Sequence, residues 1–245
     1  AVIEVEAANE RALPQIHITG LPGDVVKESR ERVRACLNQL GFEVPNTRII
    51  VHLSPATAKK QGSQFDLAIA MSVLVADGLL EPKRLKHTAF LGEVTLDGRV
   101  QKVKGALAML EALDKDDRVD TILVPHENAK EAGLLQSAKA RLVSSVGQVI
   151  DFLRGDLQLT PMEFSISDEK QEKFSDSLLD QILGQNIAKR ALQIALAGRH
   201  HLLMFGPPGV GKSMVAVTAP ELLPLLSREE FIEVAKAHCQ KSDFL

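Results

Sequence analysis

The 245-residue sequence contains no tryptophan and no tyrosine, so phenylalanine, with nine residues, is its only aromatic residue of the Phe/Trp/Tyr group. Proteins that hold single-stranded nucleic acid stack bases on aromatic rings, so only phenylalanine or arginine could serve here. The chain also lacks an excess of positive charge, since its formal net charge is −3. Both shortages argue against a globally basic nucleic-acid-binding protein and leave only a local basic patch open.

Cysteine is scarce, and the two cysteines, Cys36 and Cys239, lie far apart in the sequence. No CxxC pair or cluster of histidine and cysteine is present, so we expect no zinc site. Cys36 falls on the apolar face of an expected helix. A buried free thiol at this position fits a cytoplasmic protein.

Targeting signals are also missing from the sequence. No basic segment followed by an apolar one occurs at the N-terminus, and no run approaches the roughly 18 apolar residues of a membrane span. We therefore expect a cytoplasmic protein without membrane association. Hydrophobic residues make up 45% and charged residues 25% of the chain, which is typical of folded soluble proteins.

The most informative stretch lies near the C-terminal end. An apolar run over residues 202–205 reads as a strand, and residues 214–217 can continue a short helix. Between them, a loop fits G-x-x-x-x-G-K-[ST] at every required position: Gly206, Pro207, Pro208, Gly209, Val210, Gly211, Lys212 and Ser213.

This loop has the composition of a phosphate-binding loop. Its glycines allow the backbone to approach a ligand closely, so that successive N–H groups converge on an anion. Lys212 would reach the β- and γ-phosphates, and the Ser213 hydroxyl would ligate Mg²⁺. We therefore predict that residues 206–213 bind ATP and Mg²⁺.

The first part of the chain mixes strands and helices without strict alternation, which predicts an α+β, mixed-sheet domain over residues 1–156. Asp24 is the expected N-cap of a helix whose inward face carries Val26, Ser29/Arg30, Val33, Cys36/Leu37 and Leu40. His52 is expected to be a packed or edge residue. The pattern predicts strands over 2–7, 15–19, 48–53, 121–124 and 142–143, helices over 24–40, 65–76, 105–114, 127–135 and 146–153, and a hairpin of 90–96 and 99–103.

A polar, charged stretch without periodicity follows, and we interpret residues 157–177 as a linker. Helical spacing resumes at Leu178 and continues to Ala195, with Gly198 as its stop. Residues 178–245 are therefore expected to form a second domain that includes the glycine-rich loop.

The second part resembles the start of an AAA+ ATPase module. The resemblance rests on Leu183-Gly184-Gln185 before a helix and on the glycine-rich loop. The segment 206–226, which includes Pro220-Glu221-Leu222-Leu223-Pro224, resembles the magnesium-chelatase-related branch of these ATPases. The first part is similar to the domain that precedes the ATPase in the ComM/YifB competence-protein family. The segments that carry this similarity are 20–22, 26–34, 65–70, 90–93, 96–98 and 124–129.

The first domain is also similar in fold to the proteolytic domain of Lon proteases, which use a serine nucleophile and a lysine base. The matching positions here are Gln64 and Leu107, and neither side chain can do this chemistry. Ser63 and Lys104 are nearby but out of register. The resemblance thus implies a Lon-like domain without its catalytic dyad, and we expect no peptidase activity.

The family resemblance implies a homo-hexameric ring ATPase that remodels DNA by helicase or branch-migration activity during competence. Residues that could touch DNA phosphates are Lys27, Arg30, Arg32 and Arg34, or Lys59 and Lys60, but the sequence favours a solvated surface for each of them.

Only a short sequence follows Ser213, and it contains no apolar strand that ends in acidic residues. Such a motif, sensor residues and an arginine finger are needed for hydrolysis. We therefore expect an incomplete α/β P-loop AAA+ module, in a fragment or a natural truncation, that binds ATP weakly and does not hydrolyse it. Two alternatives remain, a Ser-Lys peptidase of the Lon type and a metal-chelatase-type ATPase.

Overall fold

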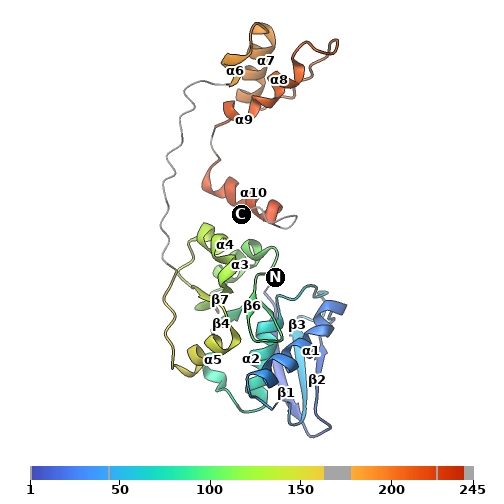
Figure 1. Ribbon diagram of the computed structural model, residues 1–245, viewed down its shortest axis with the longest axis vertical. Helices are drawn as coiled ribbons and strands as arrows, with labels where there is room; N and C mark the ends of the chain where they lie inside the picture. The colour runs from blue at the N-terminus through green and yellow to red at the C-terminus, as the bar shows by residue number, and fades with distance from the viewer. Residues whose placement is uncertain (1, 44, 163–177, 225, 240–245) are drawn as a thin grey trace. The chain divides into compact units, whose positions relative to one another are not determined.

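The computed structural model describes residues 2–43, 45–162, 178–224 and 226–239 (Figure 1). The chain divides into two compact units. Unit 1 comprises Ala1–Ser165 and Ile232–Leu245, and unit 2 comprises Ile166–Phe231. The chain therefore leaves unit 1, forms unit 2 and returns to unit 1 within its last helix.

Unit 1 combines small sheets with helices, so its fold is α+β, as the sequence predicts. Most expected elements are present near their predicted positions. In chain order they are β1 (Glu4–Glu10), β2 (Gln15–Thr19), α1 (Asp24–Gln39), β3 (Arg48–Ser54), α2 (Asp66–Ala76), η1 (Pro82–Arg84), β4 (Thr88–Phe90), β5 (Glu93–Val94), β6 (Val100–Gln101), α3 (Ala106–Asp114), β7 (Thr121–Pro125), η2 (His126–Asn128), α4 (Ala129–Leu135), β8 (Ala140–Val143) and α5 (Val146–Arg154).

The first sheet has the order β1-β3-β2, with β1 antiparallel and β2 parallel to β3. Alternate residues of β3, namely Ile49, Val51 and Leu53, are fully buried and share a core with α1 and α2. His52 lies between them, and its Nδ1 is 2.9 Å from Thr19 Oγ1. It is a packed residue of the sheet, as expected.

The second sheet is parallel throughout, in the order β4-β7-β8. Its central strand β7 is buried on both faces, as is usual for parallel strands between helices. Ile122 and Val124 pack in a core with α3 and α4, whereas Leu123 packs in the core of the first sheet. Strand β7 therefore joins the two halves of unit 1.

Three sequence predictions for unit 1 were wrong in detail. Phe90 does not belong to the hairpin, because it pairs with Leu123 as part of β4, and the hairpin strands are only β5 and β6. Asp24 is the first residue of α1 rather than its N-cap, and its carboxylate accepts a hydrogen bond from Lys27 Nζ at 3.0 Å. The first strand begins and ends later than predicted, because its pairing with β3 runs from Glu4 to Glu10.

Unit 2 contains short helices around a small core of Leu179, Ile182, Leu192 and Val215. The helix expected from Leu178 to Ala195 is divided, because Gly184 and Gln185 adopt φ angles of 71° and 55°. Its described helices are α6 (Leu178–Gln181), α7 (Asn186–Ala197), α8 (Lys212–Val217), α9 (Ala219–Leu222) and the start of α10 (Arg228–Cys239).

The strand expected over residues 202–205 is absent, and the prediction was wrong. A strand forms only when its backbone pairs with a neighbour, and the described residues of unit 2 contain no strand. Leu203 and Phe205 are consequently 86% and 92% exposed. Across the described ranges, no helix has the length and apolar character needed to cross a bilayer.

Candidate nucleotide-binding site

The glycine-rich loop, residues 206–213, leads from the extended run into α8, which begins at Lys212. Gly206, Gly209 and Gly211 have φ angles of 156°, 83° and 86°. Residues with a side chain rarely adopt these backbone angles, which explains why glycine recurs at these three positions. No heavy atom lies within 4 Å of the position that a Cβ would take at Gly209 or Gly211, so the backbone there is open to a ligand.

The Lys212 side chain folds back over its own loop. Its Nζ donates hydrogen bonds to the carbonyl oxygens of Gly206 at 2.8 Å and Pro207 at 2.7 Å. Both partners are neutral, and within the described part of the chain no carboxylate forms an ion pair with Lys212. Its positive charge therefore remains uncompensated beside the loop, which favours an anionic ligand. Ser213, the predicted magnesium ligand, is exposed in the first turn of α8.

A second segment of unit 2 is held against the loop. Gln185 Nε2 donates to the Val210 carbonyl oxygen at 2.9 Å. Leu183 and Ile187, two residues before and after Gln185, carry apolar side chains that are 93% and 88% exposed. The sequence motif Leu183-Gly184-Gln185 indicated a family, but the hydrogen bond to Val210 depends on a left-handed Gln185 that no sequence pattern revealed.

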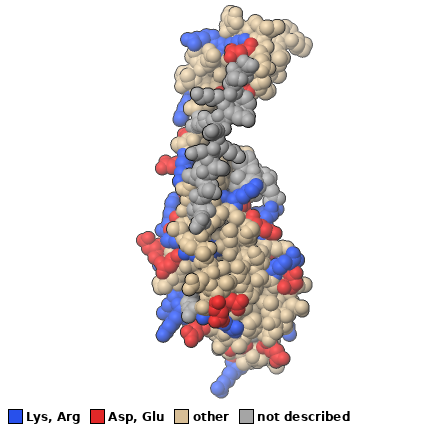
Figure 2. All heavy atoms as spheres, turned by 60° about the vertical axis from the view of Figure 1, so that its left-hand side comes forward, with Lys and Arg blue, Asp and Glu red and all other residues tan. Residues whose placement is uncertain are grey.

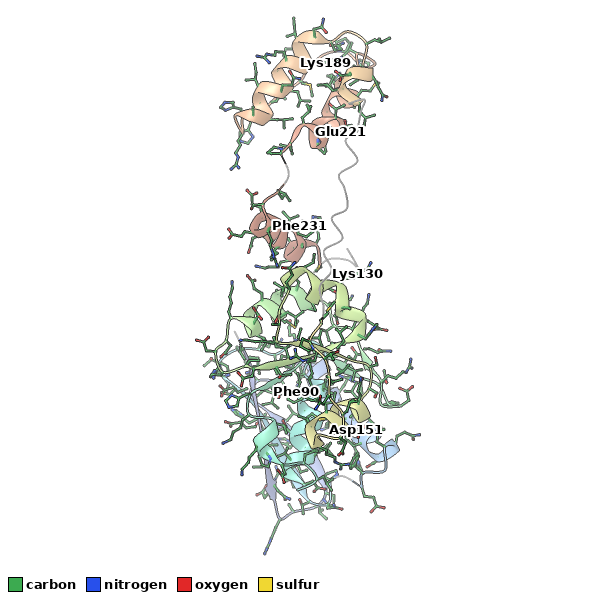
Figure 3. The ribbon with its side chains drawn as sticks, turned by 90° about the vertical axis from the view of Figure 1, so that its left-hand side faces the viewer. Phe90, Lys130, Asp151, Lys189, Glu221 and Phe231 are labelled. Atoms are coloured by element: carbon green, nitrogen blue, oxygen red, sulfur yellow. The ribbon has the colours of Figure 1, made fainter. Side chains whose placement is uncertain are left out.

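Two further hydrogen bonds connect the short helices of unit 2. Lys189 Nζ, on α7, donates to the Ile182 carbonyl oxygen at 2.5 Å. The Leu178 N–H, at the start of α6, donates to Glu221 Oε2 of α9 at 3.0 Å. Figure 3 labels Lys189 and Glu221 on these helices. These bonds join α6, α7 and α9 within unit 2.

The Lon-like positions of unit 1 hold no nucleophile and base. Gln64 precedes α2, and its Nε2 donates to the Gln61 carbonyl oxygen at 2.7 Å. Leu107, in the first turn of α3, is fully buried. The hydroxyl of the out-of-register Ser63 donates to the Glu93 carboxylate. Lys104 is exposed.

The basic residues considered for DNA contact do not form one surface. Arg32 and Lys60 turn inward, because Arg32 binds the buried Asp66 and Lys60 is only 2% exposed. Arg30 pairs with Glu31 at 3.1 Å. Figure 2 shows basic and acidic side chains interspersed over the visible face. For Arg32 and Lys60, the readings as phosphate contacts and as solvated side chains were therefore both wrong.

The matches to known proteins together cover nearly the whole chain. The family model described as subunit ChlI of Mg-chelatase matches residues 3–128, which is slightly more than half of the chain. The model for magnesium chelatase, subunit ChlI, matches residues 178–243. A short stretch of 73 residues is 36% identical to an archaeal Lon protease of Pyrococcus abyssi, so the similarity to Lon is partial.

Two relatives extend over 95% of this chain. The competence protein ComM of Haemophilus influenzae is 38% identical over 236 residues, and the uncharacterized protein YifB of Escherichia coli is 36% identical over 235 residues. The chain spans 45% of the length of each, or about half. The chain therefore belongs to the magnesium-chelatase ChlI-related family, as a protein of the ComM/YifB type.

Proposed function

We propose that residues 206–213 bind the phosphates of ATP with Mg²⁺, and that the protein is an ATP-dependent DNA-remodelling motor of the AAA+ class. The observation that carries the nucleotide site is the position of Lys212 over its own glycine-rich loop. Its ammonium group can exchange two neutral carbonyl partners for phosphate oxygens, which are stronger acceptors because they are charged.

In this proposal each part of the loop has one role. Backbone N–H groups of residues 209–213 bind the phosphates, and Lys212 binds the β- and γ-phosphates. Ser213 holds Mg²⁺, which supplies positive charge to the phosphate oxygens when it is bound. Leu183 and Ile187, exposed apolar residues on either side of the loop-bound Gln185, would offer a surface to the base.

The proposed domains are residues 1–156 as a Lon-like domain, 157–177 as a linker and 178–245 as part of an AAA+ module. The linker and residues 240–245 fall mostly or wholly outside the described residues. We propose that the Lon-like domain is a scaffold without peptidase activity, since Gln64 and Leu107 supply neither nucleophile nor base. We expect weak ATP binding without turnover by this chain, because the described residues after the loop form helices and no strand that ends in acidic residues.

DNA remodelling and assembly into a homo-hexamer are proposed for the whole protein. They are supported by the relationship to a competence protein and not by a basic surface. Metal insertion is a second candidate, because both family models are those of a magnesium chelatase subunit. A mobility shift with a four-way DNA junction and with linear duplex separates them, since only the DNA motor predicts preferential retention of the junction.

A titration with a fluorescent ATP analogue and Mg²⁺ tests the nucleotide site. We expect saturable binding that Lys212→Ala weakens at least about tenfold, because a charge-assisted contact to phosphate contributes about 1.5–3 kcal/mol. The matched control is Arg190→Ala, which removes an exposed cation from α7 of the same unit. Equal affinity of the Lys212→Ala variant and the unmodified chain contradicts the proposed site.

A further inference from the structure

Unit 1 contains a pocket of about 540 Å³ between the starts of two parallel strands and the end of helix α5. Thr88 and Thr121, the first residues of β4 and β7, pair with each other in the sheet and line the pocket on one side. The end of α5 and the turn after it line the other side. Figure 3 labels Phe90 on β4 and Asp151 on α5. A volume of this size is within the range of small-molecule binding sites.

The strand side of the pocket carries two polar side chains that the backbone holds together. His87 and Asp120 come directly before β4 and β7, and both line the pocket. The N–H groups of Asp120 and Thr121 donate to the His87 carbonyl oxygen at 2.8 Å and 3.1 Å. His87 Nδ1 lies 3.9 Å from Asp120 Oδ2. The arrangement is therefore formed by the sheet itself and does not depend on a ligand.

These two side chains offer hydrogen-bond acceptors. His87 Nδ1 is 3.0 Å from the Arg118 carbonyl oxygen. A carbonyl oxygen only accepts, so Nδ1 carries the hydrogen, and Nε2 of a neutral imidazole then has a free lone pair. An ionised carboxylate such as that of Asp120 also only accepts. The strand side therefore favours a ligand that is positively charged and rich in donors.

The chain does not supply this cation itself. Arg118 is bound to Asp116 Oδ2 at 2.8 Å and to Glu4. The guanidinium carbon of Arg154 lies 5.8 Å from the centre of the Phe42 ring. Among the residues that the structure describes, His87 is the one basic side chain within 4 Å of the Asp120 carboxylate.

The helix side of the pocket is apolar. Phe152 and Leu157 line it, and Phe152 is anchored because it packs against the main core of unit 1. The N–H groups of Gly155, Asp156 and Leu157 all donate to the Asp151 carbonyl oxygen, at 3.0, 2.9 and 3.2 Å. These bonds fold the chain back after α5 and hold Leu157 at the pocket. An alkyl chain or a flat cation can pack on such a wall.

We propose that this pocket binds a guanidinium group on an alkyl stem, as in an arginine side chain. The guanidinium donates two N–H groups to the Asp120 carboxylate and one to His87 Nε2, while the stem and the flat face pack on Phe152 and Leu157. An ammonium group fits less well, because it is compact, strongly hydrated and has no planar face. The pocket belongs to unit 1, so the proposal does not depend on the nucleotide site of unit 2.

A ligand-observed NMR titration of the full chain with butylguanidinium tests the pocket. We expect saturable binding that Asp120→Asn weakens at least about tenfold, because a charge-assisted bond is lost. Phe152→Leu should weaken it about twofold to fivefold, since the aromatic face is lost. The matched control is Asp117→Asn, an exposed aspartate of the same loop that does not line the pocket, and it should leave the affinity unchanged. Circular dichroism shows that each variant is folded.

Probes compared on the unmodified chain separate charge from shape. Pentanamide is a neutral molecule of similar size and should bind at least about tenfold more weakly than butylguanidinium, and butylammonium should lie between them. The proposal is overturned if butylguanidinium does not saturate, if pentanamide binds equally well, or if folded Asp120→Asn keeps the original affinity.

Two further probes distinguish the sources of the guanidinium group. N-acetyl-arginine amide represents an arginine within a polypeptide, whereas free arginine represents a small molecule with its own charged ends. Tighter binding of the blocked form assigns the pocket to a protein segment, and tighter binding of free arginine assigns it to a small molecule. Binding of neither form would overturn the proposal.

Discussion

The guanidinium of Arg32 donates hydrogen bonds to both carboxylate oxygens of Asp66. Arg32 Nε lies 2.8 Å from Oδ2, and Nη2 lies 3.0 Å from Oδ1. Asp66 is fully buried at the first residue of α2 and also accepts bonds from the Ser29 hydroxyl and, at 3.3 Å, from the Val94 N–H. The bond to Asp66 raises the pKa of Arg32. One carboxylate thus joins α1, α2 and β5.

Removing one member of this pair should be strongly destabilising. We expect Arg32→Met to lower the free energy of unfolding by about 3–5 kcal/mol, because it leaves a buried carboxylate without its cation. Since the chain has neither tryptophan nor tyrosine, urea unfolding is best followed by far-ultraviolet circular dichroism. Arg34→Met, an exposed position on the same helix, is the control. Equal stability of both variants contradicts this role of Arg32.

Lys60 should stabilise unit 1 although it is a buried cation. Its Nζ donates to the carbonyl oxygens of Gly20, at 2.9 Å, and Pro55. Lys60→Met leaves both carbonyls without this donor, and we expect a loss of about 1–3 kcal/mol in the free energy of unfolding. Its neighbour Lys59 is exposed, and Lys59→Met should change stability by no more than about 0.5 kcal/mol. A Lys60→Met variant that matches Lys59→Met would disprove the prediction.

Gly20 is expected to tolerate no side chain. Its φ angle is 92°, and a Cβ there would lie 2.2 Å from the carbonyl oxygen of Leu53. Gly41 has a similar φ of 88° with nothing within 4 Å of such an atom. In both alanine variants the left-handed backbone conformation lowers the free energy of unfolding by about 1–2 kcal/mol. We expect a larger decrease for Gly20→Ala, and the difference between the two variants measures the clash with the Leu53 carbonyl oxygen. Thermal unfolding of the two variants gives this comparison. Equal melting temperatures would show that the Leu53 backbone moves away at little cost, and would contradict the prediction.

The Cys36 thiol should make stability fall at alkaline pH. Burial, and to a lesser degree Asp97, raises its pKa from 9.0 to about 11. Below pH 9 both states keep the proton, so this group adds no pH dependence. Between about pH 9 and 11 the thiol ionises only in the unfolded chain, which favours unfolding by about 2–3 kcal/mol at the upper end.

Comparison with Cys36→Ala isolates this effect from the titration of lysines. Urea unfolding from pH 8 to 11 should show a steeper loss of stability for the unmodified chain than for the variant. Parallel curves would mean that the thiol ionises equally well in the folded protein.

Local patterns in the sequence determined most helices of unit 1 and the phosphate-loop motif. The spacing of Val26, Val33 and Leu37 places them on one face of a helix whatever surrounds it, because that face follows from the helical repeat. The glycines of residues 206–211 likewise predict backbone angles that other residues rarely adopt. These features depend on neighbours within a few residues, so the order of residue types is sufficient to find them.

Only the tertiary structure decided which residues meet across long stretches of chain. Arg32 and Lys60 read as surface cations, but Asp66 and the Gly20 carbonyl, 34 and 40 residues away in sequence, draw them inward. Phe90 joined β4 because Leu123 offered a parallel partner. Residues 202–205 have the composition of a strand but no described partner in their unit. Pairing and burial are properties of distant contacts, and a local pattern carries no record of them.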